Sequence, residues 1–254
     1  MYENDLMAVG AASKSKVDLY EKNKVGYLIS SMFAGLFVGL GIMLIFSIGG
    51  LLSSGGSAGT KVVMGASFGV ALSLVIFAGA ELFTGNNFVM TIGLVRGDVD
   101  TLGVIKVFVA SFIGNLLGSV LGAFLFVQAG LSKGPIGEFI AKGALGKMTA
   151  SSGELFVRGI LCNILVCLAI WCSFKMKNEV GKLIMVFWCL FVFITAGFEH
   201  SIANMTLLSI GLFAKNGLAL TFGGFVHNLL WVTLGNMVGG ILLALGYAKV
   251  GKKN

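Results

Sequence analysis

A histidine and two glutamates are the residues of this chain whose types and positions point to chemistry. Glu81 and Glu199 stand 118 residues apart in two copies of the pattern Ala-Gly-x-Glu-x-x-x-x-Asn, and His200 directly follows the second glutamate. Each copy ends a long apolar run, a setting in which ionisable side chains are costly and usually functional. An imidazole, with an ordinary pKa of about 6.5, can donate a hydrogen bond or a proton to an anion and recover it afterwards.

A second motif repeats at nearly the same offset. Gly114-Asn115-x-x-Gly118 corresponds to Gly235-Asn236-x-x-Gly239, which lies 121 residues later. Internal duplication together with interrupted apolar helices is typical of membrane transporters. We therefore expect the chain to contain two copies of one three-helix unit.

The composition places this duplication in a membrane. Hydrophobic residues make up 57% of the chain and charged residues only 11%, with a mean hydropathy of +0.96. A membrane-spanning helix needs about 20 apolar residues. Six segments meet this length, namely 25–60, 62–95, 107–132, 159–174, 183–214 and 216–248. The sequence thus predicts an all-α membrane protein with six transmembrane helices, the second and fifth of them interrupted.

Three spans in each half would make the second repeat inverted relative to the first. With the N-terminus inside, 12 of the 18 Lys and Arg residues fall in cytoplasmic segments, which favours cytoplasmic termini and accounts for the net charge of +7 without a nucleic-acid partner. The opening residues are polar and do not resemble a signal peptide. The predicted parts are a cytoplasmic N-terminal helix (1–24), a first repeat (25–128), an outer loop (129–154), a second repeat (155–248) and a cytoplasmic tail (249–254).

The two interruptions are where we expect the functional site. Thr84 or Asn86 could cap a new half-helix in the first copy, and Ser201 could do so in the second. Two helix N-termini, each carrying about half a positive charge, would then face the middle of the membrane and favour anions. We expect Glu81 and Glu199 to be structural, accepting hydrogen bonds from the backbone N–H groups freed at each break.

The sequence resembles the formate/nitrite transporter family over essentially its whole length. The resemblance rests on Gly-Phe-Glu-His-Ser-Ile-Ala-Asn-Met at 197–205, with supporting matches at 80–85 and 159–163. It implies an aquaporin-like protomer with its own pore for small monovalent anions. It further implies a homopentamer in the lipid of the cytoplasmic membrane.

The resemblance also implies roles for particular residues. His200 and Thr84 match the pore centre, with Asn163 and Asn228 as polar neighbours. Lys147 matches a lysine that attracts anions to the outer vestibule. The apolar slits would consist of Leu72, Leu82 and Phe193 on the cytoplasmic side and of Phe68, Phe83 and Val166 on the outer side.

Several alternatives stay open at this stage. Loop 84–87 and the apolar slits resemble the hydrosulfide branch of the family, which favours hydrosulfide as the substrate, with formate or nitrite as the alternative. Both a channel and a proton-coupled transporter are compatible with the resemblance. An aquaporin-type channel for neutral solutes shares the architecture, but its twin Asn-Pro-Ala boxes are excluded because the chain has one proline. An intramembrane enzyme would need a nucleophile or a metal cluster beside His200, and we expect neither these nor any cofactor. The family also suggests that the N-terminal helix gates the pore.

Overall fold

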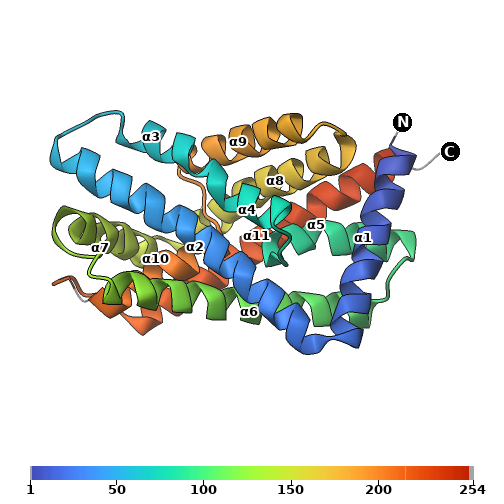
Figure 1. Cartoon of the computed structure of the whole chain (residues 1–254), viewed down its shortest axis with the longest axis horizontal. Coiled ribbons are helices and arrows are strands. Elements are labelled where there is room, and N and C mark those ends of the chain that lie inside the picture. Colours follow the sequence, from blue (N-terminus) through green and yellow to red (C-terminus); the bar gives the residue numbers. More distant parts are fainter. Residues whose placement is uncertain (1, 215, 252–254) are drawn as a thin grey trace.

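The computed structural model describes residues 2–214 and 216–251, and these residues form eleven helices without a strand (Figure 1). Some of the predictions fall outside the described residues. These are three of the lysines counted for the predicted topology, Lys215, Lys252 and Lys253, and residues 252–254 of the predicted tail. In chain order the helices are α1 (Glu3–Lys22), α2 (Lys24–Ser54), α3 (Thr60–Ser67), α4 (Gly69–Phe77), α5 (Phe83–Arg96), α6 (Thr101–Gln128), α7 (Gly134–Thr149), α8 (Ser152–Lys175), α9 (Glu179–Ala196), α10 (Ser201–Ala214) and α11 (Phe222–Gly251).

Six helical segments among the described residues are long and apolar enough to cross a membrane. They are α2, α3 with α4 as one segment (Thr60–Phe77), α6, α8, α9 and α11. The predicted second span therefore divides into α3–α4 and the half-helix α5, and the predicted fifth span into α9 and the half-helix α10. The segment predicted as an outer loop, 129–154, contains the helix α7.

Glycines in the left-handed backbone region produce both interruptions. Gly79 follows α4 with φ of 77°, and Gly197 ends α9 with φ of 80°. Residues with a Cβ rarely adopt this conformation, whereas glycine does so readily. The chain turns at these points before α5 and α10 begin. The Ala-Gly of the repeated motif is therefore a helix stop.

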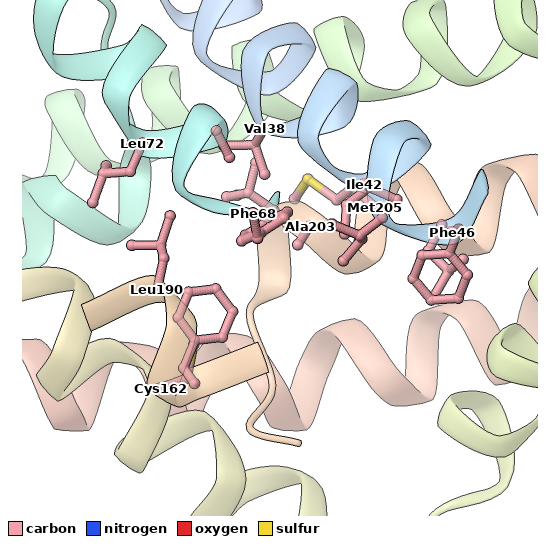
Figure 2. Close-up of a cluster of buried hydrophobic side chains, with 14 of the residues drawn as sticks. Val38, Ile42, Phe46, Phe68, Leu72, Cys162, Leu190, Ala203 and Met205 are labelled. Carbon is pink, nitrogen blue, oxygen red and sulfur yellow. The ribbon is translucent and has the colours of Figure 1, made fainter. Parts of the chain in front are cut away.

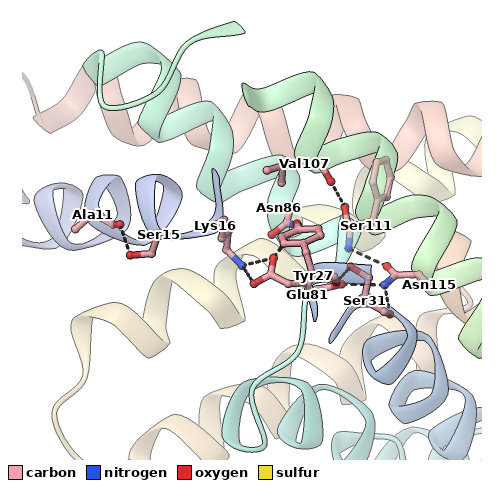
Figure 3. Close-up of polar contacts among 11 residues, drawn as sticks. Ala11, Ser15, Lys16, Tyr27, Ser31, Glu81, Asn86, Val107, Ser111 and Asn115 are labelled. Atoms are coloured by element: carbon pink, nitrogen blue, oxygen red, sulfur yellow. Dashed lines mark hydrogen bonds and ion pairs between the residues drawn. The ribbon is translucent and has the colours of Figure 1, made fainter. Parts of the chain in front are cut away.

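Two buried asparagines hold the interrupted segments in place. Asn115 Oδ1 accepts the backbone N–H of Phe83 at 2.9 Å, and its Nδ2 donates to the carbonyls of Ser31 and Glu81 at 2.7 and 2.8 Å (Figure 3). Asn236 makes the matching set, accepting from Ser201 N–H at 2.9 Å and donating to the carbonyls of Gly159 and Glu199 at 2.8 and 2.9 Å. At each break these bonds satisfy a backbone N–H and a backbone carbonyl outside the regular helix bonds, and they tie the break to a carbonyl of a neighbouring helix.

The flanking glycines of the same motif let the helices approach closely. A Cβ at Gly118 would collide with the backbone carbonyl of Met32, and a Cβ at Gly239 would collide with that of Ile160. The pairs α2 with α6 and α8 with α11 thus pack through small residues, as is common in membrane helices. The repeated Gly-Asn-x-x-Gly motif is explained by this contact and by the asparagine bonds.

Helix α1 lies across one end of the bundle, and the two described ends of the chain meet there (Figure 1). Tyr2 contacts Tyr247 of α11 with ring centroids 5.9 Å apart, and Leu6 is buried against α11 near Gly251. Both ends therefore lie on the same side of the molecule, as an even number of spans requires.

Candidate functional site

Two vestibules enter the molecule from opposite sides. The proximal vestibule, beside the chain ends, has a volume of about 560 Å³ and is lined by Lys16, Glu81, Asn86 and Lys182 among others. The distal vestibule has a volume of about 430 Å³. Its charged lining consists of Lys61, Lys142, Lys147 and Glu199.

An apolar constriction lies between the vestibules. It encloses about 10 Å³, room for about one water molecule. Figure 2 shows Phe68, Leu72 and Leu190 reaching this region from the α3–α4 segment and from α9. Leu72 and Leu82 line both the constriction and the proximal vestibule, whereas Phe193 and His200 line both the constriction and the distal vestibule. The shared residues place the three spaces in series along one route through the molecule.

His200 sits at the distal end of the constriction with its hydrogen bonds fixed. It immediately precedes α10, and its Nδ1 accepts the backbone N–H of Ala203 at 3.1 Å. Because Nδ1 is an acceptor, the ring hydrogen of the neutral imidazole belongs on Nε2. Nε2 lies 3.0 Å from Thr84 Oγ1 and therefore donates to it. Phe193 stacks on the ring with centroids 6.0 Å apart, which further restricts its orientation.

The bond between His200 and Thr84 joins the N-terminal turns of the two half-helices. Thr84 lies in the first turn of α5, and His200 caps α10. Helix N-termini carry unpaired N–H groups and about half a positive charge each. The centre of the route is therefore electropositive without containing a full cation.

Each glutamate of the repeat is paired with a lysine. Glu81 accepts from Lys16 at 2.7 and 2.8 Å, from the Tyr27 hydroxyl at 3.0 Å and from Asn86 Nδ2 at 3.3 Å (Figure 3). Glu199 accepts two bonds of 2.7 Å from Lys147 and one of 2.6 Å from Asn204 Nδ2.

The donors to both carboxylates thus differ from those expected from the sequence. Side chains bond to the carboxylates, while the backbone N–H groups of Phe83 and Ser201 at the breaks bond to Asn115 and Asn236.

Three lysines at the vestibules have no carboxylate partner within residues 2–214 and 216–251. Lys61 and Lys142 line the distal vestibule, and Lys182 lines the proximal one. Lys147, by contrast, has its charge compensated by Glu199 at 2.7 Å. The positive charge available to an incoming ion therefore comes from the unpaired lysines more than from Lys147.

The remaining residues singled out in the sequence lie around this route. Asn163 Nδ2 donates to the carbonyls of Thr84 and Asn236, and Asn228 bonds to Asn204 and to the carbonyl of Lys147. Val166 lines the constriction. Phe83 packs on Phe108 and Phe112 of α6 and does not line these three spaces.

Four further residues contribute to the site without a role predicted from the sequence, namely Asn115, Asn236, Lys16 and Tyr27. The repeated Gly-Asn-x-x-Gly motif was a signal for the asparagines. Lys16 and Tyr27 come from outside both repeated motifs, and the sequence therefore held no comparable signal for them.

The sequence profile described as formate/nitrite transporter matches residues 5–249. The chain belongs to the formate/nitrite transporter family. The nitrite transporter NirC of Escherichia coli K12 is 43% identical over 249 residues, which cover 97% of this chain and 91% of NirC. The chain is thus a multi-pass membrane transporter and not an enzyme, and the resemblance inferred from the sequence is confirmed.

A solved structure agrees with this assignment to the formate/nitrite transporter family, and a second one shares the fold. An FNT family ion channel superposes with a TM-score of 0.93 at 40% identity and covers 98% of this chain and 99% of its own. A pentameric formate channel with formate bound superposes with a TM-score of 0.78 at 24% identity, covering 91% and 98% of the two chains. These matches confirm the predicted all-α fold.

Proposed function

We propose that this protein is a channel for small monovalent anions in the cytoplasmic membrane, with nitrite as the first candidate substrate. The family match and the 43% identity to a nitrite transporter support this choice. Hydrosulfide, favoured from the sequence, and formate are the alternatives. We further propose a homopentamer, by analogy with the pentameric formate channel that shares the fold, and cytoplasmic termini, which the distribution of Lys and Arg favours.

The observation that carries the proposal is the fixed donor geometry of His200. Its Nδ1 accepts the Ala203 N–H, so Nε2–H is the ring donor that can bond to an anion in place of Thr84 Oγ1. A bare anion in an apolar passage loses hydration at a cost of several kcal/mol. A hydrogen bond from Nε2–H, together with the two helix N-termini, offsets part of that cost.

The same geometry favours hydrogen bonding over proton donation by His200. If the neutral ring gave its Nε2 proton to the anion, an anionic ring would remain among the apolar residues of the constriction. Such a charge is costly to bury. Accepting a second proton on Nδ1 would require the ring to release the Ala203 N–H. We therefore infer that the ring acts as a neutral donor while the anion passes.

A flux panel tests the proposed function. Nitrite, formate, hydrosulfide and glycerol are supplied in turn to proteoliposomes that contain the full chain, at two pH values, with protein-free liposomes as the control. We expect nitrite flux well above the control and no glycerol flux. Glycerol passage without anion flux would contradict the proposal and favour a neutral-solute channel.

A further inference from the structure

A separate groove of about 490 Å³ lies where α1 ends and where α2 and α6 begin, at the lower right of Figure 1. Tyr20, Lys24 and Lys106 form its polar lining, and Leu28, Val109 and Ile113 form much of its apolar lining. It shares no lining residue with the permeation route. The transport function proposed above therefore does not use it.

The polar lining carries net positive charge. Lys24 has no carboxylate partner in the part of the chain that the structure describes, and its Nζ lies 5.8 Å from the centre of the Tyr20 ring. Lys106 Nζ lies 2.6 Å from Glu21 Oε1, and both side chains are partly exposed. Two lysines opposed by one glutamate leave one positive charge. A ligand here should carry a negative charge.

The apolar lining continues into an exposed apolar face of α6. Ile105, Val109 and Ile113 are about half exposed and recur every four residues, so they form one stripe along α6. This stripe is about 12 Å long at 1.5 Å per residue. The hydrocarbon half of a bilayer is about 15 Å thick. The stripe thus has the length to contact most of an acyl chain.

The repeated fold does not require a lysine at position 106. At the offset of 121 that relates Asn115 to Asn236, Lys106 corresponds to His227, which bonds to the carbonyl of Ala150 at 3.0 Å. The equivalent position in the other half is therefore occupied without a lysine. Lys106 is therefore not required by the packing that the two halves share, which is consistent with a role in binding a ligand.

We propose that this groove binds an anionic phospholipid from the leaflet on the side of the chain ends. The phosphate would lie between Lys24 and Lys106, and an acyl chain would follow Val109 and Ile113. Basic pockets between transmembrane helices recognise anionic headgroups in this way. Tyr20 suits the same interface, where an aromatic ring with a hydroxyl is favourable.

Native mass spectrometry of the full chain measures this binding directly. Phosphatidylglycerol or phosphatidylcholine is titrated against the wild type, the double variant Lys24→Gln/Lys106→Gln, and the control Lys14→Gln, which removes an exposed lysine of α1. We expect tighter binding of phosphatidylglycerol to the wild type and to the control. The double variant should bind it about twenty-fivefold more weakly, at about fivefold for each lysine. Equal binding by the double variant and the wild type would overturn the proposal.

Two further variants keep the test decisive if the double variant folds poorly. Glu21→Gln breaks the ion pair but removes a negative charge, so phosphatidylglycerol should bind about fivefold more tightly. If the ion pair were merely structural, Glu21→Gln would instead weaken phosphatidylglycerol binding, because it breaks the same pair as the loss of Lys106. Val109→Trp fills the apolar lining and should weaken binding with both lysines intact. If these variants changed the oligomeric state while lipid binding stayed unchanged, the groove would be a contact with a second copy of the chain. That result would contradict the proposal.

Discussion

At the scale of single residues, His200 has two separable tasks. Its Nδ1 caps α10, and its Nε2–H faces Thr84 at the centre of the route. An asparagine side chain can perform both, since its oxygen can accept the Ala203 N–H while its amide remains a donor. Phenylalanine keeps the size of the ring but provides neither group.

We therefore expect His200→Asn to retain a substantial fraction of anion flux and His200→Phe to reduce it by about a hundredfold or more. The reduction corresponds to about 3 kcal/mol for an anion left without its donor. Flux in proteoliposomes, compared at equal amounts of incorporated protein, gives the answer. If His200→Asn were as inactive as His200→Phe, proton transfer by the imidazole would be the better explanation.

Asn115 and Asn236, which are buried at the two helix breaks, are expected to contribute strongly to the stability of the structure. Each bonds to three buried backbone groups. Replacing either by Ala leaves the backbone N–H and the carbonyl at one break without this partner, and we expect a loss of about 3 kcal/mol. Thermal unfolding in detergent measures this loss. Asn178→Ala, which removes an exposed cap of α9, is the matched control and should cost about 1 kcal/mol. Equal losses in the two cases would show that the buried bonds add little.

At the scale of helices, α1 and α7 make corresponding contacts with the two breaks. Lys16 of α1 pairs with Glu81, and Lys147 of α7 pairs with Glu199. The N-terminal helix is thus attached to the same carboxylate that lines the proximal vestibule. Whether α1 gates the pore stays a prediction, but its release would have to break this pair.

The pair can be tested by a double-mutant cycle. Lys16→Gln leaves Glu81 with a buried charge and only Tyr27 and Asn86 as partners, which should cost about 2 kcal/mol, less than for a fully buried pair. Adding Glu81→Gln should recover most of that loss, because the uncompensated charge is gone. Unfolding free energies of the single and double variants provide the coupling energy. Strictly additive losses would mean that the two residues act independently.

The helix breaks also show how far the sequence alone could lead. Interrupted second and fifth spans were predictable because Glu81 and Glu199 end long apolar runs in matching motifs. The partners of the glutamates were not predictable, because Lys16 lies 65 residues from Glu81 and only the packing of α1 brings the two together. Helix α7 was missed since its segment is mixed in polarity, and only tertiary contacts show that it covers the distal vestibule.

At the scale of the whole molecule, charge is arranged so that both entrances attract anions. Three lysines and one glutamate line the distal vestibule, and two lysines and one glutamate line the proximal one. Each glutamate neutralises one lysine at 2.7 Å, which leaves two positive charges on the distal side and one on the proximal side. Charged clefts of this kind raise the local concentration of counter-ions.

The unpaired lysines should therefore control anion capture rather than passage. We expect Lys61→Gln/Lys142→Gln to raise the half-saturating nitrite concentration for entry from the distal side by about tenfold, with little change in maximal flux. The difference in half-saturating concentration between the wild type and this variant should largely disappear as salt rises. The reason is that the screening length falls from about 10 Å at 0.1 M to about 3 Å at 1 M. Lys133→Gln, an exposed lysine that does not line the distal vestibule, is the control. A variant that kept the wild-type half-saturation and salt dependence would instead return the attracting role to Lys147. Because Lys147 is bonded to Glu199 at 2.7 Å, that result would require the pair to open as the anion arrives.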